Sequence, residues 1–126
     1  MHPILAISLG GALGALSRHY LSQLLQRHLP LTPPWTILLI NLLGCFLIGL
    51  ISAQLTHHRN GESWHLLLIT GFLGSFTTYS TFALHSTQYL QHTPETSFIL
   101  HLLSQIIFGL LACLLGLQLS HWLNKP

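Results

Sequence analysis

Apolar residues dominate four long stretches of the chain, and short polar segments separate each stretch from the next. These stretches lie at residues 3–25, 34–56, 64–90 and 97–123. Each reaches the roughly 20 residues that an α-helix needs to cross the hydrocarbon core of a bilayer. The pattern predicts an all-α protein in which residues 1–126 form one domain of four transmembrane helices.

The composition is that of an integral membrane protein. Of the 126 residues, 50% are hydrophobic and only 5% are charged, so the chain lacks the charged surface of a soluble domain. No basic segment precedes the first span, and its glycine pattern differs from that of a signal peptide, so we expect the span to be retained. We expect five of the six charged residues to lie in turns or in the tail; the six are Arg18, Arg27, Arg59, Glu62, Glu95 and Lys125.

Positive charge gives the chain little preference for one orientation in the membrane. An even number of spans places both termini and Arg59 on one side, opposite Arg27. Arg59 and Lys125 are then the basic residues on one side of the membrane and Arg27 is the basic residue on the other, while Arg18 lies within the first span. Because arginine and lysine near the span ends set orientation, this near balance predicts that the chain inserts in both orientations.

The third span contains an unusual polar segment, GFLGSFTTYSTF, at residues 71–82. Gly74 and Ser75 are poor helix formers, and hydroxyl residues follow them closely. Hydrocarbon offers no partners to freed backbone groups, so an interrupted helix survives there only beside protein groups or a wet cavity. We therefore predict that the third helix is interrupted. The segment contains hydroxyl and aromatic side chains but no carboxylate or amine, a combination that favours a site for a small ion. The alternative is a kink that the hydroxyls satisfy internally.

Two further polar residues lie inside predicted spans. The carboxamide of Asn41 either bridges two helices or contacts an ion. Arg18 follows Gly10 and Gly14 at intervals of four, so the three residues share one helical face. The glycines favour close packing against another helix, whereas Arg18 is expected to snorkel to the surface or to face water and anions.

The third and fourth spans each contain a stripe at helical spacing. Tyr79, Phe82 and Ser86 share one face, and such an aromatic stripe is usually involved in packing. In the fourth span a polar and small stripe recurs every four residues, and it serves either helix packing or pore lining. Its members are Ser97, His101, Gln105, Gly109 and Cys113.

Several classes of function have no support in the sequence. There is no glycine-rich phosphate loop and no basic patch, so we expect no nucleotide or nucleic-acid partner. The ten histidines are scattered, and His57, His58 and His65 have no ligand companions at zinc spacing. Cys45 and Cys113 lie inside spans, where packing is their ordinary role. Ser80 and His85 face different sides of one helix, and we expect no enzymatic activity.

Three blocks of sequence resemble those of the small CrcB/Fluc fluoride channels. They are GGALGALSRHY in the first span, NLLGCFLIG in the second and GFLGSFTTYSTF in the third. The resemblance implies an antiparallel, dual-topology homodimer of four-helix subunits with two fluoride pathways and a central structural sodium ion. It also implies passive, fluoride-selective export across the plasma membrane, the inner membrane of a bacterium, which lowers cytoplasmic fluoride toxicity.

The resemblance assigns roles to individual residues. Asn41 matches the pore-facing asparagine, and the backbone carbonyls of Gly74 and Thr77 match the sodium ligands. Tyr79 and Phe82 match the two aromatics of the fluoride path. Ser80 and Thr81 match the hydroxyls beside these aromatics, and Arg18 matches an arginine with a possible role near a vestibule.

The sequence departs from the family pattern at three positions. Tyr79 stands where phenylalanine is more usual, and Ser75 replaces a second glycine. His101 stands where a tyrosine is expected in the fourth span, so pore lining by His101 and Gln105 remains an expectation.

Two other functions remain open at the level of sequence. A small dual-topology exporter of another ion would have the same size and charge balance, but proton-coupled export of cations needs a carboxylate at midspan. Glu62 and Glu95 lie in predicted turns instead. A non-transporting membrane assembly subunit is the second alternative, and a measured anion flux would separate it from a channel.

Overall fold

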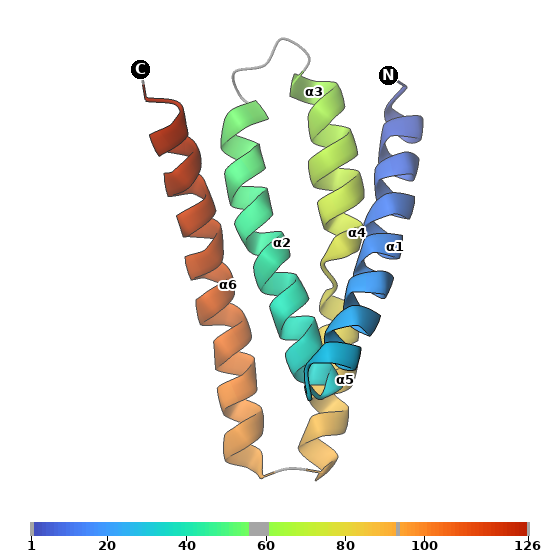
Figure 1. The fold of residues 1–126 in the computed structure, drawn as a ribbon, viewed down its shortest axis with the longest axis vertical. Helices are drawn as coiled ribbons and strands as arrows, with labels where there is room; N and C mark the ends of the chain where they lie inside the picture. The colour runs from blue at the N-terminus through green and yellow to red at the C-terminus, as the bar shows by residue number, and fades with distance from the viewer. Residues whose placement is uncertain (1, 56–60, 93, 126) are drawn as a thin grey trace.

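The computed structural model describes residues 2–55, 61–92 and 94–125, and almost all of them are helical. Figure 1 shows the elements in chain order. They are α1 (Pro3–His28), α2 (Pro33–Leu55), α3 (Gly61–Trp64), the π-helix η1 (His65–Leu73), α4 (Gly74–Phe76), α5 (Tyr79–His92) and α6 (Glu95–Leu123).

Four helical segments are long and apolar enough to cross a membrane, which confirms the predicted number of spans. They are Pro3–His28, Pro33–Leu55, Gly61–His92 and Glu95–Leu123, and the third combines α3, η1, α4 and α5. Most ends extend beyond the predicted bounds because polar residues continue the helices past the apolar core. Thr56, the predicted end of the second span, lies outside the described residues.

Three charged residues expected in turns lie in the terminal turns of helices instead. Arg27 is in the last turn of α1, whereas Glu62 and Glu95 are in the first turns of α3 and α6. These positions are favourable because the helix dipole stabilises a cation at the C-terminal end and an anion at the N-terminal end. Arg59, together with His57 and His58, lies outside the described residues.

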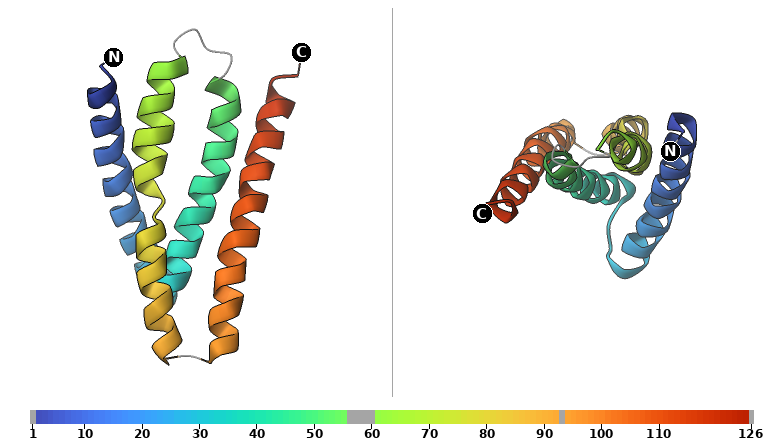
Figure 2. Two further views of the ribbon diagram at one scale, coloured as in Figure 1. Left: turned by 180° about the vertical axis from the view of Figure 1, so that it is seen from behind. Right: turned by 90° about the horizontal axis from the view of Figure 1, so that it is seen from above.

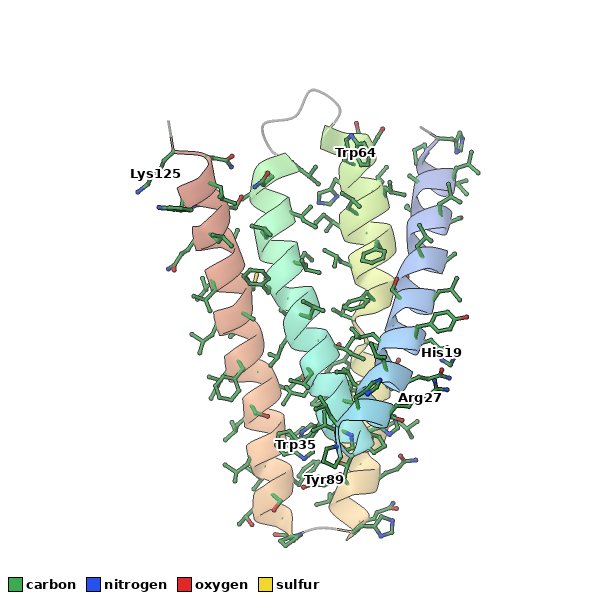
Figure 3. All side chains as sticks on the ribbon, viewed as in Figure 1. His19, Arg27, Trp35, Trp64, Tyr89 and Lys125 are labelled. Atoms are coloured by element: carbon green, nitrogen blue, oxygen red, sulfur yellow. The ribbon has the colours of Figure 1, made fainter. Side chains whose placement is uncertain are left out.

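Both ends of the described chain lie at the same end of the bundle (Figures 1 and 2). Figure 3 places Lys125 at that end, with Arg27 toward the opposite end, as the sequence predicts. In both side views α1 runs beside the upper part of the third span, and α6 runs beside α2. The bundle thus consists of two helix pairs that meet where α2 contacts the third span.

Glycines bring α1 against the third span. A methyl group on Gly10 would meet the carbonyl oxygen of Leu67, and one on Gly14 would meet that of Phe72. A methyl group on Gly71 would lie 3.0 Å from the Cα atom of Gly10. Packing is therefore the role of the small face of α1, and these backbones approach closely only because side chains are missing.

A second glycine contact joins α2 to α6. A methyl group on Gly49 would meet the Cys113 carbonyl, and one on Gly116 would meet the Phe46 carbonyl. Farther down, a methyl group on Gly109 would lie 3.7 Å from the sulfur of Cys45. Both cysteines are free and lie at this helix contact, in agreement with the packing role predicted for them.

Large apolar side chains project outward from the bundle, especially from α1 and α6. Ile4 is 68% exposed and Leu110 is 64% exposed. Such surfaces are unfavourable in water but match the hydrocarbon of a bilayer. The protein is a multi-pass membrane protein.

Candidate functional site

The helical backbone of the third span stops after α4 and resumes at α5. Phe76 ends α4, Thr77 adopts an extended conformation with φ −82° and ψ 153°, and Tyr79 begins α5. The carbonyl oxygen of Leu73 accepts two hydrogen bonds, one from the Thr77 N–H at 3.0 Å and one from its hydroxyl at 2.9 Å. The last turn before the extended residue is thereby closed.

Asn41 of α2 satisfies the backbone at this point. Its Oδ1 atom accepts a hydrogen bond from the Thr78 N–H at 3.0 Å, and its Nδ2 atom donates to the Thr78 carbonyl at 3.4 Å. The two residues are 37 positions apart, and Asn41 is only 5% exposed. The structure therefore confirms that Asn41 bridges two spans, one of the two roles open for it, while ion contact stays a prediction.

Thr78 also caps the start of α5. Its Oγ1 atom accepts a hydrogen bond from the Thr81 N–H at 3.2 Å, which is the bond that an N-cap hydroxyl makes to the third helical residue. The same hydroxyl lies 3.1 Å from the hydroxyl of Thr81 and 3.2 Å from that of Ser80. A threonine directly before a helical pattern is a cap signal, so this role of Thr78 could have been predicted from the sequence.

These contacts leave two carbonyls without their usual donors. In a continuous α-helix the Thr78 N–H would bond to the Gly74 carbonyl, and the Thr81 N–H would bond to the Thr77 carbonyl. Here those N–H groups bond to Asn41 and to the Thr78 hydroxyl. The carbonyls of Gly74 and Thr77 are thus available as oxygen ligands.

A groove of about 510 Å³ lies between α2, α6 and the third span, next to the extended residues. Most of its lining is apolar, and it includes Gly44, Ile48, Leu102 and Ile106. No lysine, arginine, aspartate or glutamate lines it among the described residues. Its polar lining consists of the Gly74 backbone and the side chains of Asn41, Thr77, Thr78, Tyr79 and Gln105.

Two aromatic side chains of the groove differ strongly in exposure. Phe82 is 7% exposed, whereas Tyr79 is 81% exposed, although their ring centroids are only 5.8 Å apart. Ser86, the third member of the predicted stripe, is 3% exposed. Tyr79 and Phe82 thus lie on the same side of α5, as their spacing predicts, but Tyr79, the first residue of α5, is not covered within the subunit.

His101 is fully buried beside this groove, among three aromatic rings. Its ring centroid lies 5.2 Å from that of Trp35 on α2, and 5.6 Å and 5.9 Å from those of Phe82 and Tyr89 on α5. Figure 3 shows Trp35 and Tyr89 near each other in the lower part of the bundle. The stripe of α6 therefore packs at Gly109 and His101 and lines the groove at Gln105.

The structure does not bring every predicted site residue to the groove. Arg18 is half-buried on α1, one turn beyond Gly14, and does not line the groove. Ser80 is exposed, and neither Ser80 nor Thr81 is part of the groove lining; their hydroxyls bond to that of Thr78, which is. Among residues 2–55, 61–92 and 94–125, no three His, Cys, Asp or Glu side chains form a group that could hold a metal ion.

Comparisons with known proteins agree with the predicted family. The family model for "CrcB-like protein, Camphor Resistance (CrcB)" matches residues 5–117. The "Fluoride-specific ion channel FluC" of Dichelobacter nodosus is 47% identical over 120 residues, which cover 95% of this chain and 98% of the relative.

Two further relatives have similar names. The "Fluoride-specific ion channel FluC" of Nitrosococcus oceani is 41% identical over 117 residues, covering 90% of this chain and 92% of the relative. The "Fluoride-specific ion channel FluC 2" of a Bacillus cereus strain is 39% identical over 117 residues, covering 92% of this chain and 95% of the relative. With four membrane-spanning helices and matches along almost its whole length, the chain belongs to the CrcB-like family.

Proposed function

We propose that this protein is a fluoride-selective channel of the plasma membrane that lets fluoride leave the cytoplasm passively. The observation that supports this most directly is the Asn41–Thr78 contact, which holds hydroxyls and Phe82 beside a groove without fixed charge. Its relatives are named as ion channels, which are not enzymes. Export of this kind reduces fluoride toxicity.

The lining chemistry suits a small, strongly hydrated anion. Fluoride needs hydrogen-bond donors to replace its water, and the carboxamide of Asn41 and the hydroxyls around Thr78 supply them. The ring edge of Phe82 carries partial positive charge and offers a weaker contact. Because no arginine or lysine lines the described groove, the anion is held weakly enough to leave again.

A second, antiparallel copy of the chain would complete the site. Tyr79 is 81% exposed and Gly74 is exposed, so positions on both sides of the helix break stand open in a single subunit. Among the described residues, a methyl group on Gly74 would meet just the Ile69 carbonyl, at 3.6 Å, so their packing within one subunit does not require glycine there. Close approach of another subunit is a reason for it.

The same assembly would hold a structural sodium ion. Carbonyl oxygens are suitable ligands for such a cation, and each subunit offers those of Gly74 and Thr77 without their helical donors. Two subunits would supply four oxygens around one ion. The bound ion would add positive charge near the groove and so reduce the cost of removing fluoride from water.

Flux from purified protein in liposomes tests the channel proposal. The protein should dissipate a fluoride gradient quickly, pass little chloride and require no proton gradient. Phe82→Ala should reduce flux while the dimer stays intact, and Leu110→Ala, at an exposed apolar position of α6, is the matched control. Equal fluoride and chloride efflux would refute selectivity. An obligatory proton gradient would indicate an exporter, and no flux at all would indicate an assembly subunit.

A further inference from the structure

The imidazole of His101 is a buried polar group without a hydrogen-bond partner. The residue is 0% exposed, and neither Nδ1 nor Nε2 has a partner among the described residues. Buried polar side chains are nearly always paired, so an unpaired one indicates a ligand, a water molecule or a functional role. If the side chain only filled space, phenylalanine would be more favourable at this position, since the surrounding side chains are aromatic.

Two other unpaired polar atoms lie near His101. Ser86 sits on α5 between Phe82 and Tyr89, the two α5 residues whose rings contact His101, and its buried hydroxyl has no partner among the described residues. Gln105 lies one turn after His101 on α6, and its buried Oε1 atom is also unpaired within the described part of the chain. Phe82 and Gln105 line the groove, and the His101 ring contacts Phe82, so His101 lies directly behind this part of the lining.

Within the described ranges, no carboxylate faces His101 from the helices around it. Tyr89 is the titratable group in ring contact, and Tyr79 lies behind Phe82. His85 bonds to Gln88 at 3.2 Å on an exposed face, and Glu95 is exposed at the start of α6. The other titratable groups on these helices are Cys45 on α2, His92 on α5, and Cys113 and His121 on α6.

This arrangement makes protonation of the ring depend on an anion. An imidazolium here would be a buried charge without a counter-charge, which is strongly unfavourable. The Cβ atoms of His101 and Gln105, one helical turn apart, are separated by about 6 Å, so an anion in the groove beside Gln105 would be close to the buried ring. That anion would supply the missing counter-charge, and the face of Trp35 or Tyr89 could further stabilise the cation.

We propose that His101 is a proton-dependent anion-binding group, so that fluoride and a proton bind the channel cooperatively. The proposal rests on the proposed function, because fluoride is the anion that it invokes. By linkage, a proton that strengthens fluoride binding is itself bound more tightly when fluoride is present, typically by about 5- to 150-fold. Since tighter binding slows exit, acidic conditions should reduce flux at high fluoride concentration.

The pH dependence of fluoride efflux tests this proposal. Between about pH 8 and about pH 5, the range in which histidine titrates, wild-type efflux at saturating fluoride should fall at least about fivefold. His101→Phe and His101→Gln should remove most of this dependence; the glutamine keeps a neutral donor, and neither variant can take up a proton. His121→Phe, an exposed histidine of the same helix, should behave like wild type. Protein-free liposomes correct for HF that crosses the bilayer alone.

Proton uptake gives a second readout that does not depend on transport. Adding fluoride to the solubilised wild-type dimer should raise the pH of a weakly buffered solution containing an indicator dye, and His101→Gln should reduce this uptake. Equal pH profiles in wild type and both His101 variants, or uptake unchanged by His101→Gln, would overturn the proposal. Fast fluoride efflux at neutral pH would still support the channel in that case, so the two proposals fail separately.

Discussion

Replacing Asn41 with alanine should destabilise the subunit by roughly 2–4 kcal/mol, since each buried backbone group left unpaired costs about 1–3 kcal/mol. The variant removes both partners of the Thr78 backbone, the acceptor at 3.0 Å and the donor at 3.4 Å. The lower part of the combined range is appropriate because the second bond is long. Thr78 is only 9% exposed, so solvent has little access to the unpaired groups.

Reversible unfolding in mixed micelles, by titration with a denaturing detergent, measures this loss. Asn41→Asp is the informative companion, because it keeps an acceptor for the Thr78 N–H but no donor for the Thr78 carbonyl. Ser52→Ala on the same helix is the control; its hydroxyl donates a hydrogen bond to the Gly49 carbonyl at 3.2 Å, within its own helix. We expect that control to change stability by less than about 0.5 kcal/mol. If Asn41→Ala costs no more than Ser52→Ala, the bridge does not stabilise the extended residues.

Three further predictions concern the glycines, the cap and the cation. Gly14→Ala should lower subunit stability by about 1–3 kcal/mol because its methyl group meets the Phe72 carbonyl. Gly74→Ala should leave the stability of the isolated subunit within about 0.5 kcal/mol of the wild-type value. The same detergent titration compares the two variants. Thr78→Val should lower subunit stability by about 1 kcal/mol through loss of the cap to Thr81, and an unchanged midpoint would contradict the cap. Thorough removal of sodium should promote dissociation of the dimer, measured by subunit exchange between fluorescently labelled dimers, and equal exchange with and without sodium would contradict a structural ion.

Local sequence determined the number of spans and the location of the polar segment. Hydrocarbon forces each spanning segment to satisfy its own backbone, so about 20 apolar residues are enough to predict a transmembrane helix. The glycines of α1 were similarly recognisable as packing residues from their spacing. The positions of helix ends were less accurate, because charged residues such as Arg27 and Glu95 extend helices that hydropathy alone would end earlier.

Only the tertiary structure decided which polar groups meet. Sequence left Asn41 between a bridge and an ion contact, and the choice depends on a residue 37 positions away in another helix. It likewise left His101 between packing and lining, and gave no sign that Trp35, Phe82 and Tyr89 would surround the ring. A periodic pattern gives the face of each helix, but the rotation and vertical offset between helices come from side-chain packing, and these two quantities decide whether a polar atom finds a partner.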